Sequence, residues 1–227
     1  MSIETFKPIE LLGSLNEVEA KNAPKELHVS GDIELLRTGR RVSVVGSRKV
    51  SPDGARRAAK LVRALVEHDI IVVSGLAAGV DTIAHSTAIE AGGKTVAVLG
   101  TPLDKFYPAA NKALQREIMA NHVAVSQFPT GYPPTPKNFP MRNRTMALLS
   151  DATVIVEAGE RSGTLHQGWE ALRLGRMLFL MDSVVNDPAL KWPAEMIHYG
   201  AQRLTRESLP HILDNIPTLT SREQLAF

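Results

Sequence analysis

Six short apolar runs, most of them rich in β-branched residues, alternate with stretches of helical periodicity along this chain. Such runs predict buried strands, and the helical stretches between them supply the crossovers that parallel strands need. We therefore predict an α/β fold with a mostly parallel sheet and helices on both faces. In such sheets ligands bind beyond the carboxyl ends of the strands, so the turns that follow the strands form the candidate site. The predicted strands cover residues 41–46, 70–73, 95–99, 123–125, 152–156 and 177–181.

The turn after the first predicted strand suits an anion. The strand 41–46 ends in glycine, Arg48 follows, and Ser51 and Pro52 then suit the N-cap and first position of a helix. Backbone N–H groups at a helix N-terminus bind phosphate, and the arginine guanidinium can fork onto one. No G-x-G-x-x-G fingerprint occurs at this turn, so NAD or FAD is not supported and we expect no cofactor.

A proline-rich segment, residues 131–144, follows the fourth predicted strand. Four prolines and one glycine fall within ten residues, from which we predict a rigid extended loop rather than a helix. The segment carries Lys137, Phe139, Arg142 and Arg144 and contains no acid. Cations that track phosphates and an aromatic that stacks on an unpaired base are the parts of a single-stranded nucleic acid site. An ordinary basic surface loop is the alternative.

Length and charge set the outer limits. The 227 residues suit one α/β domain, and we expect an N-terminal extension over residues 1–40 and an α/β domain with a C-terminal helical tail over 41–227. The net charge is only +2, yet eight basic residues and one acid lie between residues 40 and 63. Arg56, Lys60 and Arg63 share one helix face, for which a solvated surface is the simpler interpretation.

Composition also excludes several classes of protein. The chain has no cysteine, which excludes disulfides, a thiol nucleophile and a cysteine-based zinc site. No apolar run approaches the length of a membrane span, and the N-terminus has no signal-peptide core. We therefore expect a cytoplasmic protein that has no contact with a membrane.

A series of segments resembles the DNA-processing protein A family (DprA, also called Smf), in the family's order and spacing. The resemblance covers residues 27–181 and implies a Rossmann-like protein, not an enzyme, that binds single-stranded DNA. It also implies a RecA-type recombinase as partner during natural transformation, and a homodimer. The segments are LHVSGD (27–32), VSVVGSRKVSPDG (42–54), VVSGLAAGVDTIAHSTAIEAGGKTVAVLG (72–100), YPAANKALQREI (107–118), FP (139–140), RNR (142–144) and VIVEAGERSGTL (154–165).

The resemblance further implies which residues contact DNA. The G-S-R turn and the proline-rich segment map onto Gly46, Ser47, Arg48, Lys137, Phe139, Arg142, Asn143 and Arg144. The S-G-L-A-x-G-x-D and R-S-G turns, which line the same pocket, map onto Ser74, Gly75, Gly79, Asp81, Arg161, Ser162 and Gly163. Many family members add an N-terminal helical module and a C-terminal winged-helix module, and from the lengths that flank the match we expect a minimal version.

The residues after the R-S-G turn depart from the family. The family usually continues with small and apolar residues, so His166, Gln167 and Glu170 are local features of this chain. We expect Glu170 to be an exposed helix residue. His85 and His166 have no partner at metal-ligand spacing, so we expect scaffold or surface histidines and no metal site.

Two alternatives with the same fold stay open. The lysine-decarboxylase-like phosphoribohydrolases, or lonely guy proteins, cleave a base from a nucleotide with a G-G-x-G-T-x-x-E turn, which this chain resembles at Gly163 and Thr164. Gln167 stands where that turn has its acid and cannot ionise, although Glu157 or Glu170 could be a displaced carboxylate. The other alternative is a nucleotide-binding sensor, because the same glycine turns could hold a small nucleotide.

Overall fold

The computed structural model of the protein describes residues 2–218 and builds them around one nine-stranded sheet. Across the sheet the strands run in the order β1-β2-β6-β5-β4-β3-β7-β8-β9. From β6 to β9 all neighbours are parallel, whereas β2 is antiparallel to β6 and β1 to β2. The predicted fold class is confirmed. The strands are β1 (Glu4–Phe6), β2 (Leu27–Gly31), β3 (Arg41–Gly46), β4 (Ile71–Ser74), β5 (Thr95–Leu99), β6 (Val123–Ser126), β7 (Ala152–Glu157), β8 (Met177–Met181) and β9 (Gln202–Leu204).

All six predicted strands are present, and none differs from its prediction by more than one residue at either end. Three further strands, β1, β2 and β9, were not predicted. β1 and β9 have only three residues each and are largely exposed, so neither shows a buried apolar run. Residues 1–40 contribute β1 and β2 to the same sheet as the rest of the chain. The division of the chain at residue 40 stays a proposal.

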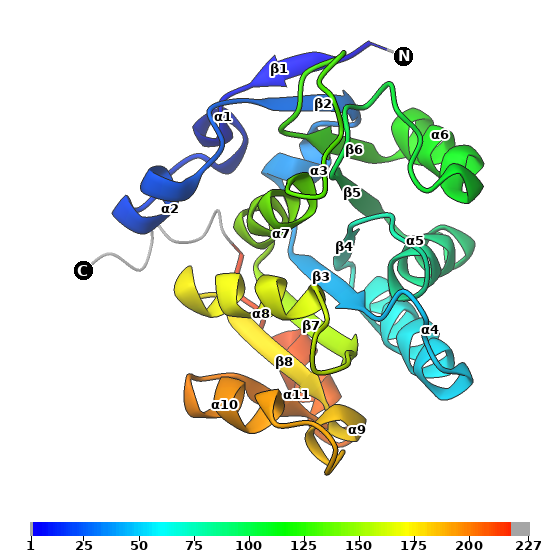
Figure 1. Cartoon of the computed structure of the whole chain (residues 1–227), viewed down its shortest axis with the longest axis vertical. Helices are drawn as coiled ribbons and strands as arrows, with labels where there is room; N and C mark the ends of the chain where they lie inside the picture. Colours follow the sequence, from blue (N-terminus) through cyan, green and yellow to red (C-terminus); the bar gives the residue numbers. More distant parts are fainter. Residues whose placement is uncertain (1, 219–227) are drawn as a thin grey trace.

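Helices cover both faces of the sheet (Figure 1). Apolar side chains of β3 alternate between the faces, because successive residues of a strand point in opposite directions. Val44 belongs to the cluster under α4 (Pro52–Glu67), α5 (Val80–Glu90) and α11 (Leu209–Asp214). Val45 belongs to the cluster under α1 (Pro8–Leu12), α3 (Glu34–Arg37), α7 (Asn138–Leu148), α8 (Thr164–Arg173) and α10 (Trp192–His198). A third cluster holds α6 (Lys112–Asn121) against β5 and β6. Within residues 2–218 no helix is long and apolar enough to cross a bilayer.

The helical elements follow the strands in the predicted alternation. The predicted helix start after β3 is confirmed, with Ser51 as N-cap and a proline at the first helical position. The helices are α1 (Pro8–Leu12), α2 (Glu17–Asn22), α3 (Glu34–Arg37), α4 (Pro52–Glu67), α5 (Val80–Glu90), the 3₁₀ turn η1 (Ala109–Asn111), α6 (Lys112–Asn121), α7 (Asn138–Leu148), α8 (Thr164–Arg173), α9 (Asp182–Val185), α10 (Trp192–His198) and α11 (Leu209–Asp214).

The order of the strands reverses between β3 and β7. From β3 the chain continues to β4, β5 and β6 on one side of the sheet, and then to β7, β8 and β9 on the other. The turns after β3 and β7 therefore diverge to opposite sides and leave a crevice between them. Open α/β sheets bind their ligands at such a switch point.

The prediction that residues 131–144 form an extended loop is wrong in its second half. Residues 131–137 form no helix or strand, but α7 begins at Asn138 and includes Phe139, Pro140 and Arg142. Pro140 is the third residue of α7. The N–H groups of the first turn of a helix have no intrahelical acceptor, so a proline there removes no hydrogen bond. Proline content alone therefore did not exclude a helix that begins within the segment.

Candidate nucleic-acid interface

A cavity of about 560 Å³ opens at the switch point between β3 and β7. Its walls are the turn after β3, the turn after β7, and the first turns of α5, α7 and α8. The structure thus brings together most of the residues that the family resemblance implied. Those that line the cavity are Gly46, Ser47, Arg48, Asp81, Phe139, Arg142, Asn143, Arg161, Ser162 and Gly163.

The turn after β3 is held by two neighbouring segments. The Ser47 N–H donates to the carbonyl of Glu157 at 2.7 Å, and the Ser47 carbonyl accepts from Val80 N–H at 3.2 Å. Gly79 is the N-cap residue of α5 and has a φ of +79°, and a Cβ on it would lie 2.2 Å from the Ser47 carbonyl oxygen. Only glycine permits this approach. The turns after β3 and β4 therefore meet backbone to backbone.

The carboxylate of Glu157 is part of this support. It accepts hydrogen bonds from the Ser51 N–H at 2.9 Å and the Ser51 hydroxyl at 2.5 Å, and the Arg57 guanidinium lies 3.6 Å away. Ser51 in turn accepts the Gly54 N–H at 3.0 Å and so caps α4. Glu157 therefore fixes the start of α4.

Arg142 lies on the floor of the cavity with 5% of its surface exposed. Its Nη1 donates to the carbonyls of Gly75 and, at 2.9 Å, Val98, at the ends of β4 and β5. A Cβ on Gly75 would overlap the guanidinium, which explains the glycine. Asn143 accepts from Arg142 Nε at 2.9 Å. Arg142 thus joins α7 to two strand ends.

Asp81 compensates the buried charge of Arg142. Desolvation raises the pKa of the Asp81 carboxyl, while the positive charge of Arg142 and the N–H of Ala77 oppose that rise. Desolvation likewise lowers the pKa of Arg142, and Asp81 opposes that change. Each of the two charges therefore offsets part of the desolvation of the other.

The turn after β7 is tied to the other walls of the cavity. Asn143 Nδ2 donates to the carbonyl of Gly163 at 3.1 Å, which connects α7 to this turn. The Thr164 hydroxyl donates to the carbonyl of Gly46 at 3.1 Å, and the Ser162 hydroxyl accepts Thr164 N–H at 3.2 Å. Hydrogen bonds thus connect α7, the turn after β7 and the end of β3.

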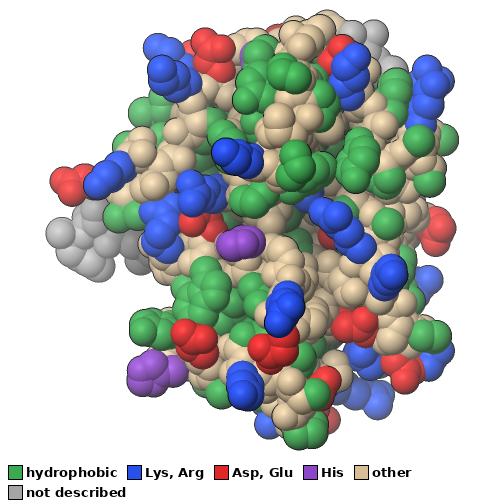
Figure 2. Space-filling view, in the orientation of Figure 1, with side chains coloured by type: hydrophobic (Ala, Val, Ile, Leu, Met, Phe, Trp, Pro, Cys, Tyr) green, Lys and Arg blue, Asp and Glu red, His purple; other side chains and the backbone are tan. Residues whose placement is uncertain are grey.

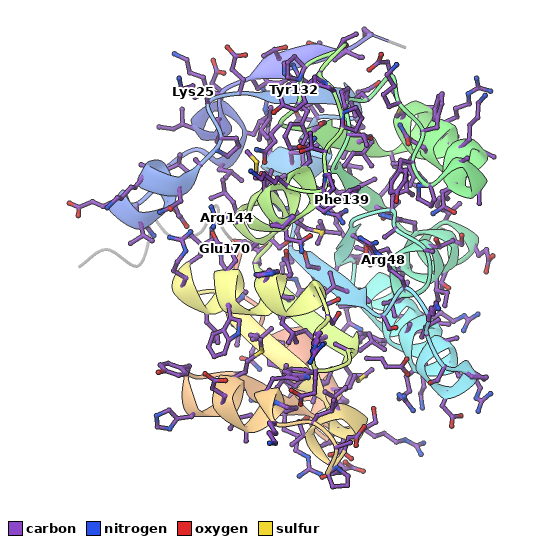
Figure 3. The ribbon with its side chains drawn as sticks, in the orientation of Figure 1. Lys25, Arg48, Tyr132, Phe139, Arg144 and Glu170 are labelled. Atoms are coloured by element: carbon purple, nitrogen blue, oxygen red, sulfur yellow. The ribbon has the colours of Figure 1, made fainter. Side chains whose placement is uncertain are left out.

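Three exposed cations surround the opening: Arg48, Lys49 and Arg161. Within residues 2–218 none of them forms an ion pair. The Arg48 guanidinium lies over the Phe139 ring, 5.6 Å from its centroid. Figure 2 shows Lys and Arg side chains spread over this face of the molecule. In Figure 3 Arg48 and Phe139 come from the two sides of the opening, the turn after β3 and α7.

Phe139 is half-buried and is contacted on several sides. Besides Arg48, it packs on Gly100, where a Cβ would lie 2.7 Å from the ring. The Tyr107 ring lies 5.5 Å from it at 45° and is 53% exposed. Tyr107 was not among the predicted site residues, although it opens the segment YPAANK that carries part of the family resemblance. Lys49 was also missed, next to the predicted Arg48.

The remaining predicted residues lie around the cavity rather than in it. The buried Ser74 hydroxyl donates to the carbonyl of Val44 at 2.7 Å and so joins β4 to β3. Lys137 and Arg144 are exposed and do not line the cavity. Figure 3 shows Arg144 and Phe139 on different sides of α7. A DNA contact by Lys137 or Arg144 therefore requires a strand that extends beyond the cavity.

The carboxylates of the hydrolase alternative are engaged elsewhere. Glu170 forms an ion pair with Arg173 and is 8% exposed, so the prediction of an exposed helix residue is wrong. It does not line the cavity. Gln167 does, but its amide is buried and, in the orientation that satisfies its neighbours, donates to the carbonyl of Asn143 and accepts Ala147 N–H at 3.2 Å.

The two histidines differ in environment. His85 is fully buried, its Nδ1 lies 2.7 Å from the Thr95 hydroxyl, and desolvation lowers its pKa to about 3. His85 is thus a scaffold residue, as predicted. His166 is exposed at the cavity. Among the described residues no cluster of three or more acidic or histidine side chains is arranged to hold a metal ion.

The sheet, its switch-point cavity and the basic rim define a Rossmann-like protein with a candidate site for an anionic ligand. The family of DNA recombination-mediator protein A matches residues 13–216, and this chain belongs to that family. DNA processing protein DprA of Streptococcus pneumoniae is 40% identical over 187 residues, which are 82% of this chain and 66% of that protein.

Two solved structures agree with this placement. An X-ray structure of the Streptococcus pneumoniae protein superposes with a TM-score of 0.82 at 35% identity, over 95% of this chain and 75% of the other. A structure of DNA processing protein A from Helicobacter pylori, which concerns its single-stranded DNA binding mode, superposes with a TM-score of 0.79 at 27% identity. The superposition covers 95% of this chain and 98% of the other. The chain spans between 43% and 66% of the length of the curated relatives it matches.

Proposed function

We propose that this protein binds single-stranded DNA without catalysis and holds the strand for a RecA-type recombinase in DNA uptake, recombination or related DNA processing. The observation that carries the proposal is the cavity at the switch point, whose rim presents three cations without an ion-pair partner among residues 2–218 beside two aromatic rings. The cations can neutralise phosphates, and unpaired bases can stack on the rings. The single-stranded DNA binding mode of the Helicobacter pylori relative supports the same ligand.

In the proposed mode the rim captures the DNA backbone. Arg48, Lys49 and Arg161 neutralise phosphates at the opening, and one base stacks on the pair formed by Tyr107 and Phe139. The floor residues hold these groups in position, because Arg142 Nε and Nη1 and the side chain of Asn143 already form hydrogen bonds within the protein. The recombinase partner, the homodimer and a cytoplasmic place of action belong to the proposal and rest on the family.

Binding to oligonucleotides tests the ligand class. We expect single-stranded DNA to bind better than blunt duplex in an electrophoretic shift assay, because an unpaired base is free to stack on Tyr107 and Phe139, whereas the bases of a duplex are already paired and stacked. If about 3–5 phosphates are neutralised, the log–log salt slope is about −2 to −3.5. Equal affinity for duplex, or binding independent of salt, contradicts the proposal. Effective competition by mononucleotides instead indicates a nucleotide-binding sensor.

A base-release assay tests the absence of catalysis. We expect no base release from nucleoside monophosphates, because Gln167 cannot ionise and Glu157 and Glu170 are bound to Ser51 and Arg173. The matched controls are Glu157→Gln and Glu170→Gln. Release by the unaltered protein that is lost in either control would overturn the non-enzymatic proposal.

A further inference from the structure

A second cavity, of about 330 Å³, lies at the carboxyl ends of β8 and β9. It is bounded by α4, by α9 and by the turn that leads from β9 into α11. Its volume is at the lower end of the range, about 300–1,000 Å³, that small ligands occupy in proteins. None of the predicted site residues lines it.

The floor of this cavity is apolar. Leu61 comes from α4, Met181 and Leu204 from the ends of β8 and β9, and Leu209 from the start of α11. Leu61 and Leu204 are buried in the core on that face of the sheet. An apolar floor of this kind accepts a flat, weakly polar ring and does not suit a small inorganic ion.

The rim of the same cavity is basic. Arg57 and Lys60 come from α4, and Arg206 comes from the turn after β9. Within residues 2–218 neither Lys60 nor Arg206 forms an ion pair. The Nε atom of Arg57 is buried and has no hydrogen-bond partner within the described part of the chain.

The acid of this rim does not neutralise these cations. The Asp182 carboxylate forms an ion pair with Arg203 and accepts Asn186 Nδ2 at 3.1 Å. The cavity therefore combines an apolar floor with an excess of positive charge. This combination matches a nucleotide, which has both a flat base and a phosphate.

The second cavity continues the edge of the first. The strands β3 and β7, whose turns line the first cavity, are followed in the sheet by β8 and β9. Neighbouring strands lie about 4.8 Å apart, so the two cavities are separated by roughly 10 Å along the edge of the sheet. The connection between them is the cluster of Ser51, Glu157 and Arg57, in which Glu157 contacts the other two.

We propose that the second cavity binds a further nucleotide of the DNA strand whose neighbouring part occupies the first cavity. The base of this nucleotide lies on the apolar floor, and Lys60 and Arg206 contact the phosphates on either side of it. This inference rests on the proposed function and specifies the path of the strand, which runs across the ends of β7, β8 and β9.

The length of the strand separates the two cavities. An oligothymidine of about five nucleotides fills the first cavity only, and one of about 20 nucleotides reaches both. We expect Lys60→Ala and Arg206→Ala each to lower the affinity for the long strand about three- to tenfold and to leave the affinity for the short strand unchanged. The salt slope for the long strand becomes shallower by about 0.7 for each phosphate that the variant no longer neutralises. The matched control is Arg63→Ala, which removes an exposed cation of α4 outside the cavity.

Three outcomes overturn the inference while the proposed function stands. The first is that the two variants bind the long strand as tightly as Arg63→Ala does. The second is that they lose as much affinity for the short strand as for the long one. The third is that a long strand substituted with 4-thiothymine does not cross-link to the peptides of Met181 or Leu209 in the unaltered protein. Failure of the unaltered protein to bind either strand refutes the proposed function itself, so the two failures are distinguishable.

Discussion

The floor and the rim of the first cavity use the same residue types in opposite ways. On the floor Arg142 is 5% exposed and bonded to strand carbonyls, with Asp81 as its compensating charge. On the rim Arg48 is accessible at the opening, and its guanidinium lies over the Phe139 ring. A cation in a family motif therefore either holds the cavity together or is available to a ligand. Burial and hydrogen bonding to the protein distinguish the first role from the second.

Replacement of the floor arginine has the largest expected effect. Arg142→Ala leaves the buried Asp81 without its compensating charge and removes donors from two carbonyls, so we expect a loss of about 3–5 kcal/mol of unfolding free energy. Chemical denaturation measures it. Arg161→Ala on the rim is the control, and we expect less than about 0.5 kcal/mol there. Comparable losses in both variants would erase the distinction between floor and rim.

Replacement of the rim arginine tests the other half of the comparison. Arg48→Ala removes a charge-assisted contact to phosphate and should cost about 1.5–3 kcal/mol of binding free energy to single-stranded DNA. Stability should stay unchanged. Arg48→Lys should recover only part of the binding, because an ammonium cannot fork. Fluorescence anisotropy supplies the measurement. A loss of equal size in Arg63→Ala would show that the binding face lies elsewhere.

The two rings span the boundary between rim and floor. Tyr107→Ala should weaken single-stranded DNA binding by about 1–3 kcal/mol with little loss of stability, and Tyr107→Phe should be tolerated. Phe139→Ala should lower both the affinity for single-stranded DNA and the stability of the fold, because the Phe139 ring also packs on Gly100. Salt slopes, measured by the same titrations at several ionic strengths, should remain unchanged in these variants. Normal DNA binding by a destabilised Phe139→Ala protein would assign that ring to the fold alone.

The buried His85 adds a dependence on pH to this comparison. His85 has a pKa of about 3 in the folded protein and about 6.5 when unfolded. Between these values the unfolded chain binds more protons, so acidification through this window should destabilise the protein by up to about 1.4 kcal/mol per pH unit. The raised pKa of Asp81 acts in the opposite direction. The unfolding free energy measured against pH should be flatter in His85→Gln than in the unaltered protein; identical curves for the two would contradict this.

The sequence determined the parts of this protein that depend on local pattern. Apolar runs of β-branched residues placed six strands to within one residue, because period and side-chain type act over a few neighbouring positions. Ser51 followed by Pro52 located the start of α4 for the same reason. Since parallel strands share an edge, the turns after β3, β4 and β7 could be assigned to one site before any contact was known.

The tertiary structure alone decided which basic and aromatic side chains are available to a ligand. Arg41 and Arg48 lie seven residues apart, yet Arg41 is fully buried and its N–H donates to Asp151 at 2.6 Å. The position of Tyr107 beside Phe139 depends on two segments that are distant in the chain. Burial, and with it the strength of each charge, is set by such long-range packing, because desolvation depends on everything that surrounds a group and not on its neighbours in sequence.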